Sequence, residues 1–147
     1  MAKAHDLLTA RAWAGANVTD IVTRALDAFT PAQVEVCGTS VDVLPQQALA
    51  LSLVLHELAT NAAKYGALST NGAVSVTWQK PVADNGGTTL TVVWQEFDGP
   101  PVKAPRQSGF GTSLIRDLIP HELGGRVELM FESNGVICRI DIPLAGA

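Results

Sequence analysis

One segment constrains the fold more than any other part of the chain. Residues 46–65 run without a break in good helix formers, with Pro45 before them and Gly66 after them. Proline suits the first turn of a helix and glycine commonly follows its end, so the sequence predicts one long central helix. The apolar side of such a helix must pack on a second layer. The residues expected on that side are Leu51, Leu55, Leu58, Ala59 and Ala62.

The segments that can supply the second layer are short and rich in β-branched and aromatic residues. They occur in pairs separated by turn residues, chiefly glycine, serine, asparagine and aspartate, which is typical of hairpins. The expected antiparallel pairs are residues 33–37 with 41–44, 73–79 with 89–95, and 126–131 with 136–143.

Further helices are predicted from apolar residues at helical spacing. These segments are residues 4–14, residues 17–29 with Asn17 or Thr19 as the cap, and residues 109–123, which Pro120 should break or kink. Helices grouped among antiparallel strand pairs indicate an α+β fold. We therefore predict a two-layer sandwich, in which helices cover one face of a mixed, mostly antiparallel sheet.

Composition narrows the class of protein. The chain has 147 residues, 47% of them hydrophobic, and its longest apolar run is far below the ~20 residues that a membrane span needs. The net charge of −4 argues against nucleic acid as a partner. Cys37 and Cys138 lie in apolar stretches and are expected to be reduced core residues, which fits the cytoplasm. The charged start, MAKAHDLLTAR, differs from an export signal.

The central helix carries polar residues that a core helix does not need. Glu57, Asn61 and Lys64 stand at i, i+4 and i+7, which places them on one stripe, opposite the apolar side. A functional interpretation makes this stripe one wall of a site. The alternative is a solvated stripe whose members support the helix by mutual contacts.

Two other segments carry groups suited to a ligand. Residues 109–115, GFGTSLI, place two glycines at the start of a predicted helix, where free N–H groups attract anions such as phosphate. Residues 94–101, WQEFDGPP, end a strand in Glu96 and Asp98, and a carboxylate there can accept a hydrogen bond from an amine. The alternatives are a flexible turn before a helix and a strand that ends in solvent.

Together and in this order, these segments resemble the nucleotide-binding site of the ATPase superfamily shared by gyrase, heat-shock protein 90, MutL and the histidine kinases (the GHKL superfamily, with the Bergerat fold). Within it the chain closely resembles the catalytic domain of HWE-family sensor histidine kinases. That family is named for a histidine and a Trp-x-Glu, found here as His56 in HELATNAAKYGAL and as Trp94-Gln95-Glu96. The resemblance covers roughly residues 15–144.

The resemblance implies roles for individual residues. Asn61 would bind a Mg²⁺ ion that bridges the phosphates of ATP, and Glu57 would orient a water or polarise the reacting groups. Glu96 would accept a hydrogen bond from the adenine amino group. The implied nucleotide-binding residues are Asn61, Lys64, Tyr65, Glu96, Gly99, Gly109, Phe110, Gly111, Thr112, Ser113 and Leu114.

The chain departs from the family pattern in places. The family usually has two adjacent glycines after Trp-x-Glu, where this chain has Asp98-Gly99, and the expected lid over the phosphates has only Lys103 and Arg106 as cations. His56 cannot share the stripe of Glu57, because adjacent helix residues point about 100° apart, so we assign it a structural role, bonding a strand or loop.

The implied function is a kinase, ATP:protein-histidine phosphotransferase. Residues 1–14 would be the tail of an upstream dimerisation hairpin that carries the phosphoacceptor histidine, and residues 15–147 the catalytic domain. This domain would be monomeric when isolated, make no membrane contact, and act through a response regulator. Two alternatives stay open: an ATPase or ATP-sensing switch without kinase activity, and an interaction module in which Asp98 prevents nucleotide binding.

Overall fold

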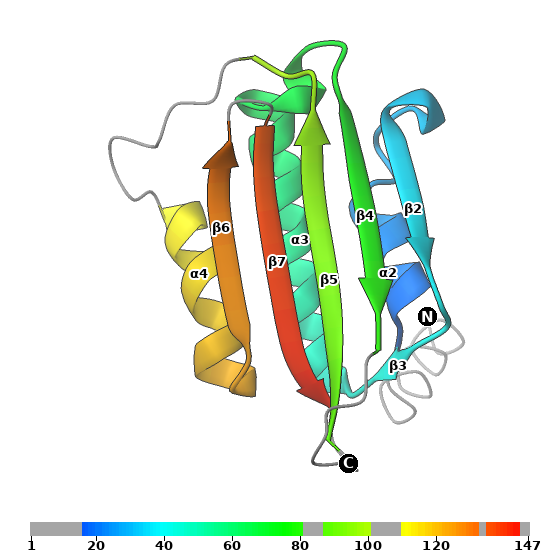
Figure 1. The fold of residues 1–147 in the computed structure, drawn as a ribbon, viewed down its shortest axis with the longest axis vertical. Coiled ribbons are helices and arrows are strands. Elements are labelled where there is room, and N and C mark those ends of the chain that lie inside the picture. The colour runs from blue at the N-terminus through cyan, green and yellow to red at the C-terminus, as the bar shows by residue number, and fades with distance from the viewer. Residues whose placement is uncertain (1–15, 81–86, 101–109, 133–134, 145–147) are drawn as a thin grey trace, which may run out of the picture.

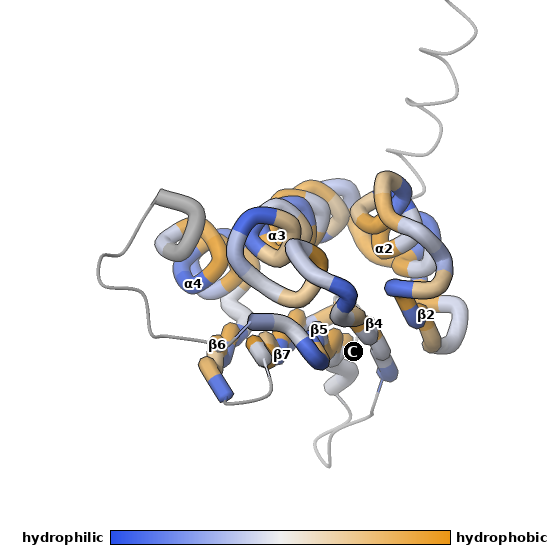
Figure 2. Tube along the Cα trace, turned by 90° about the horizontal axis from the view of Figure 1, so that it is seen from above, coloured by the Kyte–Doolittle hydropathy of each residue, from blue (hydrophilic) through white to orange (hydrophobic). Residues whose placement is uncertain are grey.

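The structure, a computed structural model, describes residues 16–80, 87–100, 110–132 and 135–144. Its helices form one layer and its main sheet the other (Figures 1 and 2). The helices are α2 (Val18–Ala25), α3 (Pro45–Lys64) and α4 (Phe110–Leu123), with short 3₁₀ turns η1 (Pro31–Gln33) and η2 (Ala67–Ser69). All three helices lie on the same face of the sheet, with α3 in the middle (Figure 2). The predicted two-layer α+β architecture is confirmed.

The main sheet has five strands in the order β2-β4-β5-β7-β6. Only the pair β2 and β4 is parallel, and the other three pairs are antiparallel, so the sheet is mixed as predicted. Both larger predicted hairpins are present. The strands are β2 (Val34–Gly38), β4 (Ala73–Gln79), β5 (Thr88–Phe97), β6 (Arg126–Glu132) and β7 (Gly135–Leu144).

The predicted hairpin of residues 33–37 with 41–44 is wrong. Instead β2 runs parallel to β4, and β3 (Asp42–Val43) pairs with β1 (Ala16–Asn17) in a separate two-stranded sheet. Contacts distant in sequence hold the intervening turn away from β2. The indole Nε1 of Trp78 donates to the carbonyl oxygen of Thr39 at 2.7 Å, and the amide nitrogen of Val18 donates to the carbonyl oxygen of Val41 at 2.8 Å.

The helix boundaries follow their local signals. The side chain of Asn17 accepts from the amide nitrogen of Thr19 at 2.9 Å, which confirms Asn17 as the cap of α2. This helix ends at Ala25, four residues before the predicted end at Phe29, and α3 begins at Pro45 as expected. The helix α4 continues through Pro120, so a break at that residue, one of the two predicted outcomes, is wrong.

The core lies between the sheet and the helices. Trp94, Leu51 and Leu55 are completely buried there, and every residue predicted on the apolar side of the central helix is buried. Cys138 is also buried, where loss of hydration raises the pKa of its thiol to about 12. The core assignment of Cys37 is wrong, because this residue is exposed on the edge strand β2, where side chains alternate between the two faces.

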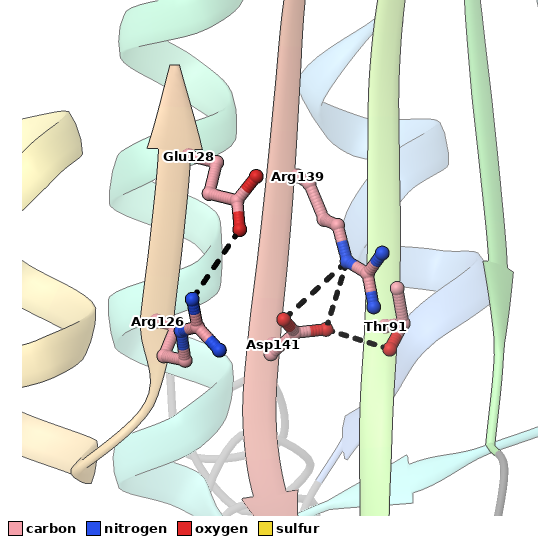
Figure 3. A network of polar contacts seen from close by, with 5 residues as sticks. All are labelled: Thr91, Arg126, Glu128, Arg139 and Asp141. Atoms are coloured by element: carbon pink, nitrogen blue, oxygen red, sulfur yellow. Dashed lines mark hydrogen bonds and ion pairs between the residues drawn. The ribbon is translucent and has the colours of Figure 1, made fainter.

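The other face of the sheet carries a polar network between β5, β6 and β7 (Figure 3). The hydroxyl of Thr91 donates to Oδ1 of Asp141 at 2.7 Å, and Nε of Arg139 lies 3.4 Å from the Asp141 carboxylate. A second ion pair joins Arg126 and Glu128 at 3.5 Å. No helix in the described part of the chain covers this face (Figure 2). Polar side chains there are compatible with contact with water.

Candidate functional site

Elements that are far apart in the sequence meet at one end of the sandwich, the upper end in Figure 1. The end of α3, the end of β5 and the start of β7 lie there, and α4 begins on the same side and runs back down. The helices α3 and α4 are packed neighbours (Figure 2). The topology therefore brings the predicted stripe of α3, the carboxylate of β5 and the first turn of α4 to one region.

Glu96 is the most unusual side chain in this region. It lies on the inner, helix-facing side of β5, with only 4% of its surface exposed. Its Oε1 accepts from the amide nitrogen of Ala67, and its Oε2 accepts from Nε1 of Trp94, both at 3.0 Å. Burial raises the pKa of the Glu96 carboxyl, and these two hydrogen bonds oppose that shift. A carboxylate thus occupies a position where a core strand would ordinarily carry an apolar residue.

Glycines allow the surrounding backbone to approach Glu96 closely. A Cβ atom at Gly66 would collide with Oε1 of Glu96, and one at Gly135 would collide with the carbonyl oxygen of Glu96. A Cβ atom at Gly99 would lie 2.6 Å from Cα of Ala67. The segments after α3 and after β5 and the first residue of β7 are therefore packed closely around Glu96.

Asp98 has a backbone conformation that favours glycine. Its φ angle is +57°, in the left-handed region that L-residues other than asparagine and aspartate seldom adopt. This finding gives a physical reason for a glycine at this position in the pattern that the chain resembles. Aspartate retains the same turn at some conformational cost, because its short side chain tolerates the left-handed region.

The polar stripe of α3 runs along the border between the buried and the exposed sides of that helix, and not opposite the apolar side as predicted. Ala50, which lies seven residues before Glu57 and in line with it, is buried. Glu57 and Asn61 are half-buried, Lys64 is exposed, and Tyr65 is 75% exposed. Within the part of the chain that the structure describes, the side chains of Glu57, Asn61 and Lys64 form no hydrogen bond or ion pair with one another. The alternative of a stripe stabilised by its own mutual contacts is therefore not supported.

The structural role expected for His56 is not supported. The residue is exposed on α3, and its ring makes no hydrogen bond to any residue that the structure describes. The backbone carbonyl of His56 accepts from the hydroxyl of Thr60 at 2.8 Å.

The first turn of α4 contains Phe110, Gly111 and Thr112, followed by an exposed Ser113 and a half-buried Leu114. The start of a helix presents unpaired N–H groups and the positive end of the helix dipole, so it favours anions. Gly109 and the predicted lid with Lys103 and Arg106 lie outside the described residues.

The sequence did not reveal the part that Gly66 and Gly135 play around Glu96. Gly66 was predicted only as the residue that follows the central helix, and Gly135 only as part of the turn between residues 131 and 136. Their contacts with Glu96 join residues that are distant in the chain, so no local pattern could show them. The available signal was a carboxylate on the core-facing side of a strand, at Glu96, two residues after a tryptophan.

The fold is that of a histidine kinase catalytic domain. The catalytic domain of histidine kinase ThkA superposes with a TM-score of 0.63 at 20% identity, covering 87% of this chain and 92% of that one. The Erythrobacter litoralis EL346 blue-light activated histidine kinase gives a TM-score of 0.64 at 25% identity, covering 87% of this chain and 41% of that one. The predicted fold family is thereby confirmed.

Sequence relatives point to the same class. The chain is 34% identical over 148 residues to the blue-light-activated histidine kinase of Brucella ovis, a match that covers 98% of this chain and 30% of that protein. The corresponding protein of Rhizobium johnstonii is 32% identical over 147 residues, covering 99% of this chain and 42% of the relative. No protein-family model matches the chain. This chain thus corresponds to the catalytic domain of a histidine kinase, and it spans less than half the length of these curated relatives.

Proposed function

We propose that the chain binds Mg-ATP between the polar stripe of α3 and the first turn of α4, and that it transfers the γ-phosphoryl group to a histidine. The observation that carries this proposal is Glu96, a buried carboxylate at the end of β5 held beside both α3 and β7. A carboxylate in this position can accept a hydrogen bond from the adenine amino group, which is a donor. The acceptor histidine would lie on a helical hairpin of the same kinase.

The residues of α3 fit a magnesium ion that is held mainly by the nucleotide. Mg²⁺ prefers oxygen ligands and commonly takes only one or two from the protein, the rest coming from phosphates and water. Asn61 offers an amide oxygen, and Glu57 lies one turn earlier on the same stripe. No group of three or more His, Cys, Asp or Glu side chains able to hold a metal occurs among the described residues. An ion that arrives bound to ATP would need few ligands from the protein.

The remaining proposed contacts surround the phosphates and the sugar. Lys64 and Tyr65 would face phosphate or ribose, and Gly99 would lie beside the nucleotide. The first turn of α4 would hold the phosphates through its backbone N–H groups, with Gly109 before it. Because phosphoryl transfer depends mainly on positioning and charge neutralisation, these groups would account for much of the rate enhancement.

The partners are proposed on the same basis. Histidine kinase ThkA, whose fold is similar with a TM-score of 0.61, has been solved in complex with the response regulator TrrA. We expect a response regulator to receive the phosphoryl group here as well, in the cytoplasm, and the isolated domain to be monomeric. In the described residues no helix is long and apolar enough to cross a membrane.

Calorimetry with ATP, in the presence and absence of Mg²⁺, tests the site. Asn61→Ala should abolish the metal-dependent part of the affinity, whereas Asn71→Ala, which alters an exposed asparagine in the turn before β4, should leave it unchanged. Unchanged metal dependence in Asn61→Ala would refute the magnesium assignment. Radiolabelled ATP with a separately supplied histidine hairpin tests transfer. Turnover of ATP to ADP without a labelled hairpin would favour the ATPase alternative.

A further inference from the structure

Two buried side chains of β5 lie two residues apart on the inner face of the sheet. Side chains alternate along a strand, so Trp94 and Glu96 point to the same side, toward the helices. Trp94 is completely buried, and its Nε1 donates to Oε2 of Glu96 at 3.0 Å. The tryptophan therefore contributes a hydrogen-bond donor to a buried carboxylate in addition to filling the core.

This donor acts together with a second one from a different element. The amide nitrogen of Ala67, in η2, donates to the other oxygen of Glu96 at 3.0 Å. The last torsion of a glutamate side chain is normally broad, but donors fixed to both oxygens hold the carboxylate plane in one orientation. An ionised carboxylate has about four acceptor positions, so about two stay open after these hydrogen bonds. A preorganised acceptor of this kind loses little freedom when a ligand arrives.

We propose that Trp94 is a positioning residue for nucleotide recognition: its indole N–H orients the Glu96 carboxylate so that the open acceptor positions meet the amino group of adenine. The inference rests on the proposed function, because it takes ATP as the ligand of Glu96. Guanine carries a carbonyl oxygen where adenine carries the amino group, and a carboxylate repels that oxygen. Trp94 would therefore support the preference for ATP over GTP as well as the affinity.

The chain offers a matched control on the neighbouring strand. Trp78 is also buried on the inner face, and its Nε1 donates to the carbonyl oxygen of Thr39 at 2.7 Å, away from Glu96. Trp94→Phe and Trp78→Phe each remove one indole donor and a similar volume from the same layer. A general effect of losing a buried tryptophan should appear in both variants, whereas an effect on Glu96 should appear only in Trp94→Phe.

Calorimetry with ATP and GTP at pH 6 and pH 8 tests the proposal. Trp94→Phe should weaken ATP binding about three- to tenfold, the loss expected for one hydrogen bond, and should reduce the preference for ATP. The loss should be larger at pH 6, because removal of the donor raises the pKa of the Glu96 carboxyl further and protonation occupies an acceptor oxygen. Trp78→Phe should bind both nucleotides like the original chain.

A measurement on the unaltered chain covers the case in which Trp94→Phe does not fold. In an NMR titration, the indole N–H resonance of Trp94 should shift on addition of ATP, while that of Trp78 stays in place. Unchanged ATP affinity in a folded Trp94→Phe variant, an equal loss in both variants, or a Trp94 resonance unaffected by saturating ATP would each overturn the inference. Failure of the proposed function is distinguishable, since the unaltered chain would then bind no ATP at all.

Discussion

The amide nitrogen of Ala67 donates to Oε1 of Glu96 at 3.0 Å, although the two residues are 29 positions apart in the chain. This hydrogen bond joins the turn after α3 to the end of β5. Gly66 makes the approach feasible, since any side chain at that position would occupy the space of the carboxylate. The geometry of the candidate site therefore depends on a residue that has no side chain of its own.

Gly66→Ala should destabilise the domain by about 1–3 kcal/mol, the usual range for overpacking, because the new methyl group collides with Glu96. The backbone φ of Gly66 is negative, so the substitution adds no backbone strain to this effect. It should also weaken ATP binding by displacing the carboxylate. Gly124→Ala is the control, since it follows α4 in the same way but has open space around it. The control variant should be destabilised only by the strain of an alanine at positive φ, and its affinity for ATP should not change. Urea unfolding and calorimetry measure the two effects, and equal ATP affinity in both variants would contradict the prediction.

Asp98→Gly should stabilise the domain by about 0.5–1 kcal/mol. The φ angle of +57° costs an L-residue energy that glycine avoids, although the more flexible unfolded chain offsets part of the gain. Asp98→Ala should act in the opposite direction, because alanine lacks the polar side chain that eases this conformation. The urea concentrations at the unfolding midpoint measure the difference between the two variants, provided that the dependence of the unfolding free energy on urea has the same slope in both. A midpoint for Asp98→Gly below that of Asp98→Ala would show that the backbone conformation is not the dominant effect.

The raised pKa of Glu96 predicts a specific dependence of stability on pH. Because burial favours the protonated form, folding is assisted below the ordinary value of 4.5, and this contribution is lost as the pH rises through the raised pKa. In Glu96→Gln the contribution should disappear, so the difference in unfolding free energy between the two proteins should change across that range. Urea unfolding at a series of pH values tests this.

The exposed Glu35 provides the matched control. Glu35→Gln also removes one carboxylate, but that carboxylate is exposed, whereas the one removed in Glu96→Gln is buried. If the difference between the original chain and Glu96→Gln is constant from pH 4 to pH 8, the assignment of this pH dependence to Glu96 is wrong.

Gln47→Ala should lower the free energy of unfolding by about 1–3 kcal/mol. This buried side chain accepts from the amide nitrogen of Leu44 at 2.7 Å and donates to the carbonyl oxygen of Pro143 at 3.1 Å, joining the start of α3 to β7. Its removal leaves both backbone groups without that partner. Gln46→Ala, at an exposed position next to it, should change stability by less than about 0.5 kcal/mol. Chemical unfolding of both variants measures the contrast.

The parts of the fold that follow local rules could be predicted from the sequence. The helix α3 and the two larger hairpins were predicted because helical spacing, alternation and turn residues are all contained within short segments. The position of β2 was not, because its partner is β4, and a parallel pair leaves no turn between its strands to identify it. The exposure of Cys37 follows from the same pairing, since Cys37 pairs with the exposed Thr77 and shares its face of the sheet, whereas Val36 packs against the core.

The candidate site, like the fold, has features that could be predicted from the sequence and features that could not. Glu57, Asn61 and Glu96 could be chosen from spacing and residue type, and the ends of α3 and β5 lie at the same end of the sandwich (Figure 1). Their role in binding stays a prediction. The hydrogen bonds of Glu96 with Trp94 and Ala67 depend on three-dimensional packing, and so does the close approach of Gly99 to Ala67 beside the left-handed backbone of Asp98. Apart from the spacing of two residues between Trp94 and Glu96, no period or spacing in the sequence relates these residues.

The parallel pairing of β2 with β4 also affects how the chain must fold. The segment between Val34 and Val74 contains the whole of α3. A long loop must therefore close before these two strands gain their hydrogen bonds. The strand β2 has one neighbour in the sheet, whereas β4 and β5 have two. Its amide protons should therefore exchange with solvent before those of β5, and local opening of the domain should begin at this edge.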